Sequence, residues 1–239
     1  PSALIDTPLE TPVACDKPDA ARANTLMWYD KPAQSWTESL PLGNGRLGAM
    51  VYGKVGDEII HLNEDTLWAG GPYTHCNEQG GKNIAEIRKL VFERKYRQAC
   101  ELFDKTMLGE PQEMLKYLPL CDLELNLPFA KHVDNYRREL DLATGIATVR
   151  YQADGVSYTR EAFVSTPDQV IVVHIAADKP GVVDAGVWLQ GRTDEREVSG
   201  GSFTVEAARD GLVLKGRNCD FRGVSGQEKY QVMLKVARQ

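Results

Sequence analysis

The sequence predicts a large antiparallel β-sandwich with a short two-helix insertion. After residue 120, nine short segments rich in β-branched and aromatic residues are separated by Gly, Asp, Pro and Asn turns. Strands at such short intervals are typical of sandwiches. A parallel sheet would need a helix between most strands, and no helical pattern follows Met107, so antiparallel pairing is expected. The nine segments are CDLELNL, YRRELDL, IATVRYQA, VSYTREAFVS, VIVVHIAA, VVDAGVWLQ, SFTVEA, LVLKGR and KYQVMLKVA.

One of these segments, Val156 to Val164, shows the alternation of a strand with two different faces. One face would carry Val156, Tyr158, Arg160, Ala162 and Val164, and the other Ser157, Thr159, Glu161 and Phe163. Mixed faces of this kind suit an antiparallel sheet that is buried on one side.

Upstream of the nine segments, three regions differ in their residue patterns. Residues 1–25 have no sustained period and predict an extended lead-in, whereas residues 26–239 are expected to form one sandwich domain. Strands near Leu47 to Val55 and Glu58 to Leu62 are separated by a turn and predict a hairpin. Apolar residues then recur at helical spacing and predict two amphipathic helices. They are Ile84, Ile87, Leu90 and Val91, followed by Tyr96, Ala99, Cys100, Phe103 and Met107.

Composition excludes several classes of protein. Hydrophobic residues make up 42% and charged residues 26% of the 239 residues, which is ordinary for a globular chain. The 28 basic residues are dispersed and outnumbered by 34 acidic ones, so no nucleic-acid partner is expected. No apolar run approaches the roughly 20 residues that span a bilayer, so we expect no membrane segment.

The cysteines and histidines do not suggest a metal or redox site. The five cysteines are widely spaced without a C-x-x-C pair, so most are expected to be core or free thiols, with a bridge from Cys76 to a partner as an alternative. The four histidines lack metal-ligand spacing, and His174, within VIVVHIAA, is expected to be a core histidine. We expect neither metal nor cofactor.

The segment GNGRLG matches a G-x-G-x-x-G pattern through Gly43, Gly45 and Gly48. A dinucleotide site needs a helix after this turn, and here a strand is predicted, so the glycines are expected to permit a tight turn. Asn44 and Arg46 would project from that turn. Arg46 would bind a carboxylate or a sugar hydroxyl, or form a structural salt bridge.

The segment HLNEDTLWAGGP combines polar side chains with an aromatic platform before a Gly-Gly-Pro turn. A sugar site needs this mixture, because pyranose C–H faces pack on indole while amides and carboxylates bind the hydroxyls. The structural alternative is that Asp65 or Thr66 caps the turn and Trp68 is a buried anchor.

Glu64 and Asp65 do not form a glycosidase pair by themselves, because neighbouring residues of an extended chain point to opposite sides. A distant partner such as Glu38 or Asp122 is an alternative. No G-x-S-x-G nucleophile motif is present.

Several segments together resemble the N-terminal domain of bacterial α-L-fucosidases of glycoside hydrolase family 95. In order, they are LMWYDKPAQSWTESLPLGNGRLGAMVYGKV, EIIHLNEDTLWAGGP, IAEIRKLVFERKYRQACEL and YLPLCDLELNL. The resemblance implies a parent enzyme that removes α-L-fucosyl residues from oligosaccharides or glycans by an inverting mechanism. It also implies that catalysis belongs to an (α/α)6 barrel that this chain does not contain, so no catalytic residue maps here and the chain alone would be inactive.

The resemblance further implies that the sandwich packs against the parent's own barrel and shapes its substrate entrance. The residues expected to bind substrate there are Asn63, Glu64, Thr66, Trp68, Asn44 and Arg46. The alternative is a non-catalytic carbohydrate-binding β-sandwich module. A strand pattern runs into Gln239, so we expect a truncated chain. The start at Pro1 indicates either a processed end, from which a signal peptide has been removed, or an engineered one. A periplasmic or extracellular location is expected.

Overall fold

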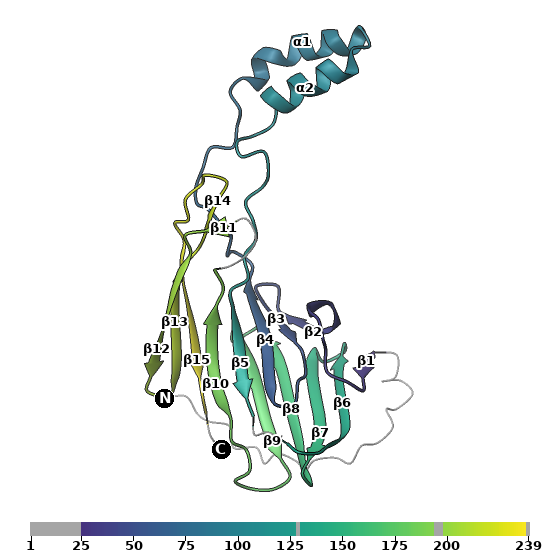
Figure 1. The fold of residues 1–239 in the computed structure, drawn as a ribbon, viewed down its shortest axis with the longest axis vertical. Coiled ribbons are helices and arrows are strands. Elements are labelled where there is room, and N and C mark those ends of the chain that lie inside the picture. Colours follow the sequence, from purple (N-terminus) through teal and green to yellow (C-terminus); the bar gives the residue numbers. More distant parts are fainter. Residues whose placement is uncertain (1–24, 128–129, 194–197, 238–239) are drawn as a thin grey trace. The chain divides into compact units, whose positions relative to one another are not determined.

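Antiparallel strands dominate a computed structural model that describes residues 25–127, 130–193 and 198–237 (Figure 1). The nine predicted segments all form strands, and the predicted helical interval forms two helices. The β-rich fold class with a two-helix insertion is therefore confirmed. The lead-in predicted for residues 1–25 lies outside the described residues except for Thr25.

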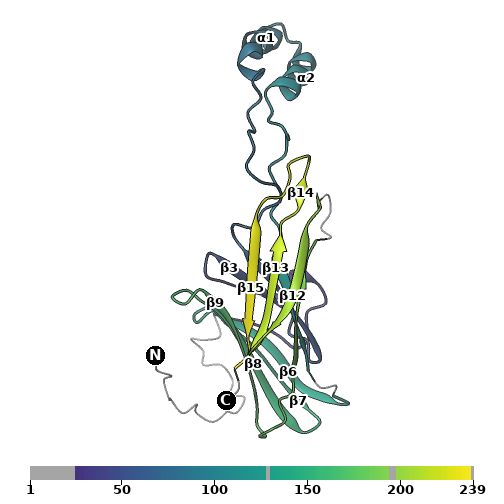
Figure 2. The same cartoon turned by 90° about the vertical axis from the view of Figure 1, so that its left-hand side faces the viewer.

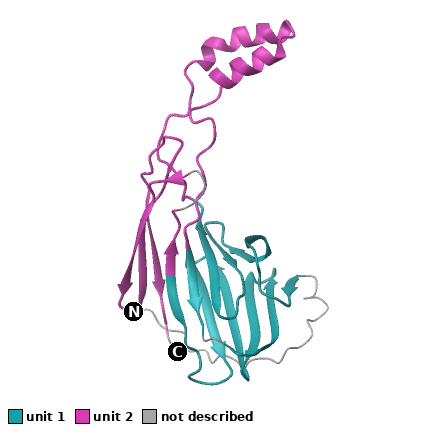
Figure 3. Cartoon of the chain, viewed as in Figure 1, with its two compact units in different colours: residues 1–65, 122–188 teal, residues 66–121, 189–239 magenta. Residues whose placement is uncertain are grey.

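The chain divides into two compact units (Figure 3). Unit 1 comprises residues 1–65 and 122–188, and unit 2 comprises residues 66–121 and 189–239. Both units are assembled from two separate stretches of chain. Each unit therefore depends on contacts between residues that are distant in the sequence.

Unit 1 is built on two five-stranded sheets. The first sheet contains, in spatial order, β1 (Leu26–Tyr29), β6 (Val133–Asp141), β7 (Ile146–Ala153), β8 (Val156–Ser165) and β9 (Val170–Ala177). The second contains β10 (Gly186–Gly191), β5 (Cys121–Asn126), β4 (Asp57–Glu64), β3 (Leu47–Val51) and β2 (Leu40–Gly43), of which β10 leaves unit 1 after Trp188. A 3-10 turn, η2 (Trp36–Glu38), precedes β2.

The two sheets face each other, with β2 and β3 in contact with β7, β8 and β9. Alternation along strands such as β4 and β5 supplies the core between them. In β4, for example, Glu58, Ile60 and Leu62 are buried, while the intervening residues are not. The apolar core between the sheets includes Leu40, Leu42, Ala49, Val51, Leu123, Leu125, Leu140, Ala147, Val149, Tyr151 and Ala162.

A buried ion pair joins the two sheets. Glu58 of β4 is fully buried and accepts a hydrogen bond of 2.5 Å from Nη2 of Arg160 in β8. The other oxygen of Glu58 accepts from the backbone N–H groups of Tyr52 and Gly53, and the same Arg160 nitrogen also donates to the Lys54 carbonyl. Burial raises the pKa of the Glu58 carboxyl, against the attraction of Arg160 and the backbone N–H groups. The pair thus ties β8 to the segment that connects β3 with β4.

A second buried arginine, Arg138 of β6, anchors the segment that leads into β2. Its Nε donates to the Lys31 carbonyl at 2.8 Å and its Nη1 to the Glu38 carbonyl at 2.7 Å. The guanidinium also lies 4.2 Å from the centre of the Tyr29 ring, a cation–π geometry. Because the guanidinium is planar and carries several donors, one side chain holds three separate parts of the chain.

Unit 2 contains a three-stranded sheet and a short two-stranded one. The first has the order β12 (Ser202–Ala208), β13 (Gly211–Arg217) and β15 (Lys229–Lys235), which lie side by side in Figure 2. The second pairs β11 (Val198–Ser199) with β14 (Asp220–Phe221). Tyr230 pairs with Gly216, and a Cβ at Gly216 would lie 2.2 Å from the Tyr230 ring, so the glycine makes room for the aromatic ring. Burial raises the pKa of Tyr230 to about 12.

The helical insertion of unit 2 is a hairpin of α1 (Gly80–Phe92) and α2 (Tyr96–Thr106), which pack against each other. The turn between them contains Arg94 in the left-handed region, with a φ of 59°. Ile84 and Phe103, which were predicted to lie on apolar helix faces, are 40% and 42% exposed. Neither helix is long and apolar enough to cross a membrane, within the residues that the structure describes.

Two expectations about single residue types have different outcomes. Cys76 and Cys100 are exposed free thiols, and Cys121 and Cys219 are buried, as expected of core cysteines. Cys15 lies outside the described residues. The prediction of a core position for His174 is wrong, because its side chain is 40% exposed and lies 3.9 Å from Glu161. The reason is that β9 is the last strand of its sheet, so its apolar run is only half-buried.

Glu58→Ala is expected to lower the free energy of unfolding by about 3 to 5 kcal/mol, because Arg160 would remain buried without its counter-charge. The double variant Glu58→Leu/Arg160→Met should lose much less, since neither charge then needs compensation. Among the described residues the Nε and Nη1 atoms of Arg160 have no acceptor, which adds to the cost that the double variant removes.

Urea unfolding followed by circular dichroism measures both variants. Glu206→Ala is the control, because Glu206 pairs with Lys215 on the surface and is 58% exposed, so its loss should change stability little. Equal losses for Glu58→Ala and Glu206→Ala would contradict a structural role for the buried pair.

Candidate functional site

The turn between β2 and β3 carries two of the residues predicted to bind substrate. Gly43 pairs with Gly48, and Gly45 has a φ of +93°, as the expectation of a tight glycine turn requires. The Oδ1 atom of Asn44 accepts from the backbone N–H groups of Arg46 and Leu47 at 3.0 and 2.8 Å. The side chain of Asn44 therefore holds the turn that presents Arg46.

Asn44 also fixes this turn to the opposite sheet. Its Nδ2 donates to the carbonyl of Ser165, the last residue of β8, at 2.9 Å. Both polar atoms of Asn44 are thus engaged within the protein. The residue is placed to position its neighbours, and any ligand at this turn would be bound chiefly by Arg46.

Arg46 forms the salt bridge that the sequence allowed as its structural alternative. Its Nε lies 3.0 Å from Oε1 of Glu64, and the Asp65 N–H donates to the Arg46 carbonyl at 3.0 Å. The Glu64 side chain is 15% exposed and that of Arg46 is 56% exposed. The charged end of β4 and the β2–β3 turn consequently form one polar edge of unit 1, with the guanidinium facing solvent.

Asn63 lies beside this edge, on the outer face of β4. It pairs with Gly48 of β3, whose missing side chain leaves the outer face open next to the amide. The structure thus brings Asn44, Arg46, Asn63 and Glu64 together at one end of β3 and β4.

Further along the outer face, His61 links β4 to β5 and to the end of β3. Its Nδ1 lies 2.5 Å from Oδ1 of Asp122, and its Nε2 lies 3.0 Å from the hydroxyl of Tyr52. A carboxylate beside Nδ1 favours a proton on that nitrogen and leaves Nε2 to accept from the Tyr52 hydroxyl. The sequence had indicated Asp122 only as a distant partner for another carboxylate. Here it orients a histidine instead.

Thr66 and Trp68, the remaining predicted residues, belong to unit 2. Thr66 is exposed in the turn after β4, and Trp68 is half-buried and forms an isolated bridge with Tyr117, with the ring centres 5.3 Å apart. A cleft of about 470 Å³ adjoins Trp68. Its lining consists of Trp68, Ala69, Gly70, Gly71, Pro72, Leu115, Gln227 and Glu228. The six predicted residues are therefore divided between the two compact units.

Asn218 holds the backbone of this cleft, and sequence reasoning missed it. The residue is 2% exposed, and its Nδ2 donates to the carbonyls of Trp68 and Gly70 at 2.7 and 2.6 Å. Its Oδ1 accepts from the Glu228 N–H at 3.0 Å. The only local signal is an asparagine between two predicted strands, which is the ordinary composition of a turn.

The described residues offer no metal centre, because no group of three or more His, Cys, Asp or Glu side chains converges among them. The carboxylates that the sequence suggested as members of a glycosidase pair have other partners. Glu64 pairs with Arg46, Asp122 with His61, and Glu38 accepts from the Gln34 N–H at 2.8 Å. The polar edge of unit 1 and the cleft of unit 2 can bind hydroxyl-rich ligands, but neither presents an acid and a base aimed at one bond.

The chain is similar in sequence to N-terminal domains of glycosyl hydrolases and to proteins named as fucosidases. Residues 27–239 match the family model described as "Glycosyl hydrolase family 65, N-terminal domain". The chain is 42% identical over 154 residues to "Alpha-L-fucosidase 2" of Arabidopsis thaliana, an alignment that covers 64% of this chain and 18% of the relative.

Two fungal relatives match in a similar way. "Probable alpha-fucosidase A" of Aspergillus niger is 33% identical over 162 residues, and the protein of that name from Aspergillus oryzae is 34% identical over 158 residues. Each alignment covers 64% of this chain and 20% or 21% of the relative. The chain therefore spans about a fifth of the length of the curated relatives it matches.

Asn218→Ala is expected to destabilise the chain by about 1 to 3 kcal/mol, because two carbonyls and one N–H group would lose their buried partner. Thermal or urea unfolding measures the loss. Gln112→Ala is the control, since Gln112 is also an amide residue of unit 2 but is exposed, and its Nε2 donates to the Asp104 carbonyl at 3.2 Å. If both variants unfolded alike, Asn218 would not support the Trp68 cleft.

Proposed function

The chain belongs to the family of glycosyl hydrolase family 65 N-terminal domains, and from this premise we propose that it is the N-terminal domain of an α-L-fucosidase of the family 95 type. The observation that carries the proposal is the 42% identity to a protein named alpha-L-fucosidase, joined to a family match over residues 27–239. The parent would remove α-L-fucosyl residues from oligosaccharides or glycans.

We place the catalytic groups of the parent outside this chain. Three of the carboxylates that were candidates for catalysis, Glu64, Asp122 and Glu38, are engaged by Arg46, His61 and a backbone N–H group. An inverting glycosidase needs an acid and a base about 6.5 to 9.5 Å apart on either side of the scissile bond. In this proposal a helical barrel of the parent supplies both groups, and the parent acts in the periplasm or outside the cell.

The proposed role of the sandwich is to pack against that barrel and to shape its substrate entrance. Asn63 and the Arg46–Glu64 pair form a polar edge on unit 1, and Trp68 provides an aromatic surface on unit 2. Amides and charged groups suit sugar hydroxyls, and an indole suits the C–H face of a pyranose. We propose that Asn63, Glu64, Thr66, Trp68 and Arg46 contact the glycan, with Asn44 as their support.

The first test is stereochemical. The full-length parent should release L-fucose from 2′-fucosyllactose, and proton NMR early in the reaction should detect the β-anomer, because inversion at an α-linked carbon produces β. Residues 1–239 alone should release none. Early α-anomer would contradict the inverting mechanism, and turnover by residues 1–239 would contradict a catalytic site elsewhere.

The second test addresses the entrance residues. Asn63→Ala and Trp68→Ala in the parent should each raise KM or lower kcat for 2′-fucosyllactose by about tenfold, equivalent to about 1.4 kcal/mol of lost binding to substrate or transition state. Thermal melting should show a small change. Trp36→Ala, which removes an indole that is 56% exposed, is the control and should leave both constants unchanged.

Kinetics equal to those of the parent, combined with a clear fall in melting temperature, would show that Asn63 and Trp68 support the fold and do not contact the glycan.

A further inference from the structure

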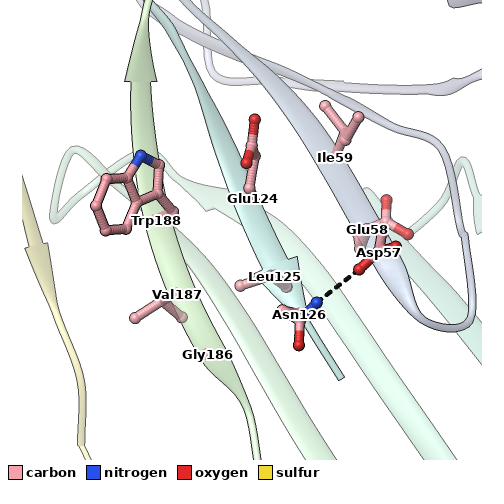
Figure 4. Close-up of a pocket in the computed structure, with 9 residues that line it drawn as sticks. All are labelled: Asp57, Glu58, Ile59, Glu124, Leu125, Asn126, Gly186, Val187 and Trp188. Atoms are coloured by element: carbon pink, nitrogen blue, oxygen red, sulfur yellow. Dashed lines mark hydrogen bonds between the residues drawn. The ribbon is translucent and has the colours of Figure 1, made fainter. Parts of the chain in front are cut away.

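A shallow groove of about 270 Å³ lies on the outer face of β4, β5 and β10, within unit 1 (Figure 4). Alternation along the strands determines which residues reach it. In β5 the residues Leu123 and Leu125 are buried, so Glu124 and Asn126 project from the opposite face. Figure 4 shows Glu124, Trp188 and the Asn126–Asp57 pair on three neighbouring strands.

The hydrogen bonds across β4 and β5 establish how these side chains are ordered. His61 bonds to Asp122 and Asp57 bonds to Asn126, so the two strands run antiparallel. The outer face consequently presents rows of opposed side chains, and the row of Asp57 and Asn126 is at one end of the groove.

Trp188 forms the aromatic wall of the groove. It lies on β10, the outer strand of its sheet, and is 56% exposed although the next residue, Leu189, is 1% exposed. The indole offers a flat apolar surface beside polar groups of the neighbouring strand.

The polar groups of the groove are planar, and two of them are held by a hydrogen bond. Asn126 donates through Nδ2 to Oδ1 of Asp57 at 2.7 Å, which orients both the amide and the carboxylate. Glu124 adds a second outward carboxylate, whereas Glu58, which also lines the groove, is buried and paired with Arg160. No Lys or Arg lines the groove. The groove therefore offers acceptors and an amide next to an aromatic face.

From this chemistry we propose that the groove is a binding surface for a neutral oligosaccharide. A pyranose ring can pack its C–H face on Trp188 while its hydroxyls donate to Glu124 and Asp57. An anionic glycan or a phosphate would be repelled by the two carboxylates. At about 270 Å³ the groove is just below the roughly 300 to 1,000 Å³ of pockets that enclose a ligand, so it suits a chain bound along the surface.

This surface goes beyond the proposed role at the substrate entrance. The groove includes Asp57 and Ile59 at the start of β4, and the entrance residues Asn63 and Glu64 are at its end. Ile59 and Asn63 are about 13 Å apart at roughly 3.3 Å per residue, and Asp57 and Glu64 about 23 Å. The groove would bind a part of a glycan that carries no fucose, and it does not depend on the parent's being a fucosidase.

The experiment uses the full-length parent and probes without fucose. Lactose, cellotetraose and mannotetraose are titrated by isothermal titration calorimetry, a readout that does not depend on the indoles that the variants remove. Tetragalacturonate is the anionic probe. At least one neutral probe should bind, and tetragalacturonate should not. Trp188→Ala should weaken that binding at least tenfold, and Asn126→Ala should weaken it severalfold without removing a large side chain.

Trp36→Ala is the matched control, because Trp36 is also in unit 1 and is also 56% exposed, but lines no part of the groove. It should leave oligosaccharide binding unchanged. Hydrolysis of 4-nitrophenyl α-L-fucoside by the same variants reports separately on the proposed enzyme activity, and Trp188→Ala should retain it.

Three results would overturn the proposal. They are the absence of binding by every neutral probe, equal binding by the parent and the Trp188→Ala variant, and equal losses in the Trp188→Ala and Trp36→Ala variants. A lowered melting temperature of Trp188→Ala with unaltered oligosaccharide binding would instead identify Trp188 as a contact to another part of the parent, which also overturns it.

Discussion

The ion pair between Glu58 and Arg160 is the constraint on which unit 1 depends. It lies between the two sheets and fixes which face of β4 and of β8 is turned inward, because a buried charge tolerates only the register that brings its partner within reach. A slip of one residue would expose Ile60 and Leu62 and bury Asp57 and His61. The same pair holds the backbone between β3 and β4 through Tyr52, Gly53 and Lys54.

Because one set of residues of β4 faces the core, the alternating set determines which side chains the outer face presents. Residues that alternate with the core of β4 project outward, and two of them meet a side chain of β5. Asp57 meets Asn126, and His61 meets Asp122. Glu64 ends the strand and meets Arg46 of the β2–β3 turn. A polar edge and a groove walled by Trp188 thus arise at opposite ends of one strand. Both are suited to hydroxyl-rich ligands, which agrees with a domain of a glycoside hydrolase.

Local patterns predicted most of the secondary structure. The nine segments with β-branched residues and the helical interval all became the expected elements, because each carries its own periodicity. Strands β1, β2, β11 and β14 were not predicted, since two to four residues are too few to show a period. His174 was misplaced for a different reason. An apolar run predicts burial, but the position of β9 at the end of its sheet leaves that run half-exposed.

By itself the sequence determined the β-rich class, the two helices, the glycine turn and the resemblance to fucosidase N-terminal domains. Each of these features depends on a pattern within a short stretch of residues. Only the tertiary structure decided which distant residues meet. Arg160 is 102 positions from Glu58, and Asn218 is 150 positions from Trp68, yet each pair is in contact. The alternation of a strand specifies two faces but not the neighbouring strand. Pairing between distant strands depends on the packing of the whole unit, and therefore cannot be read from any one segment.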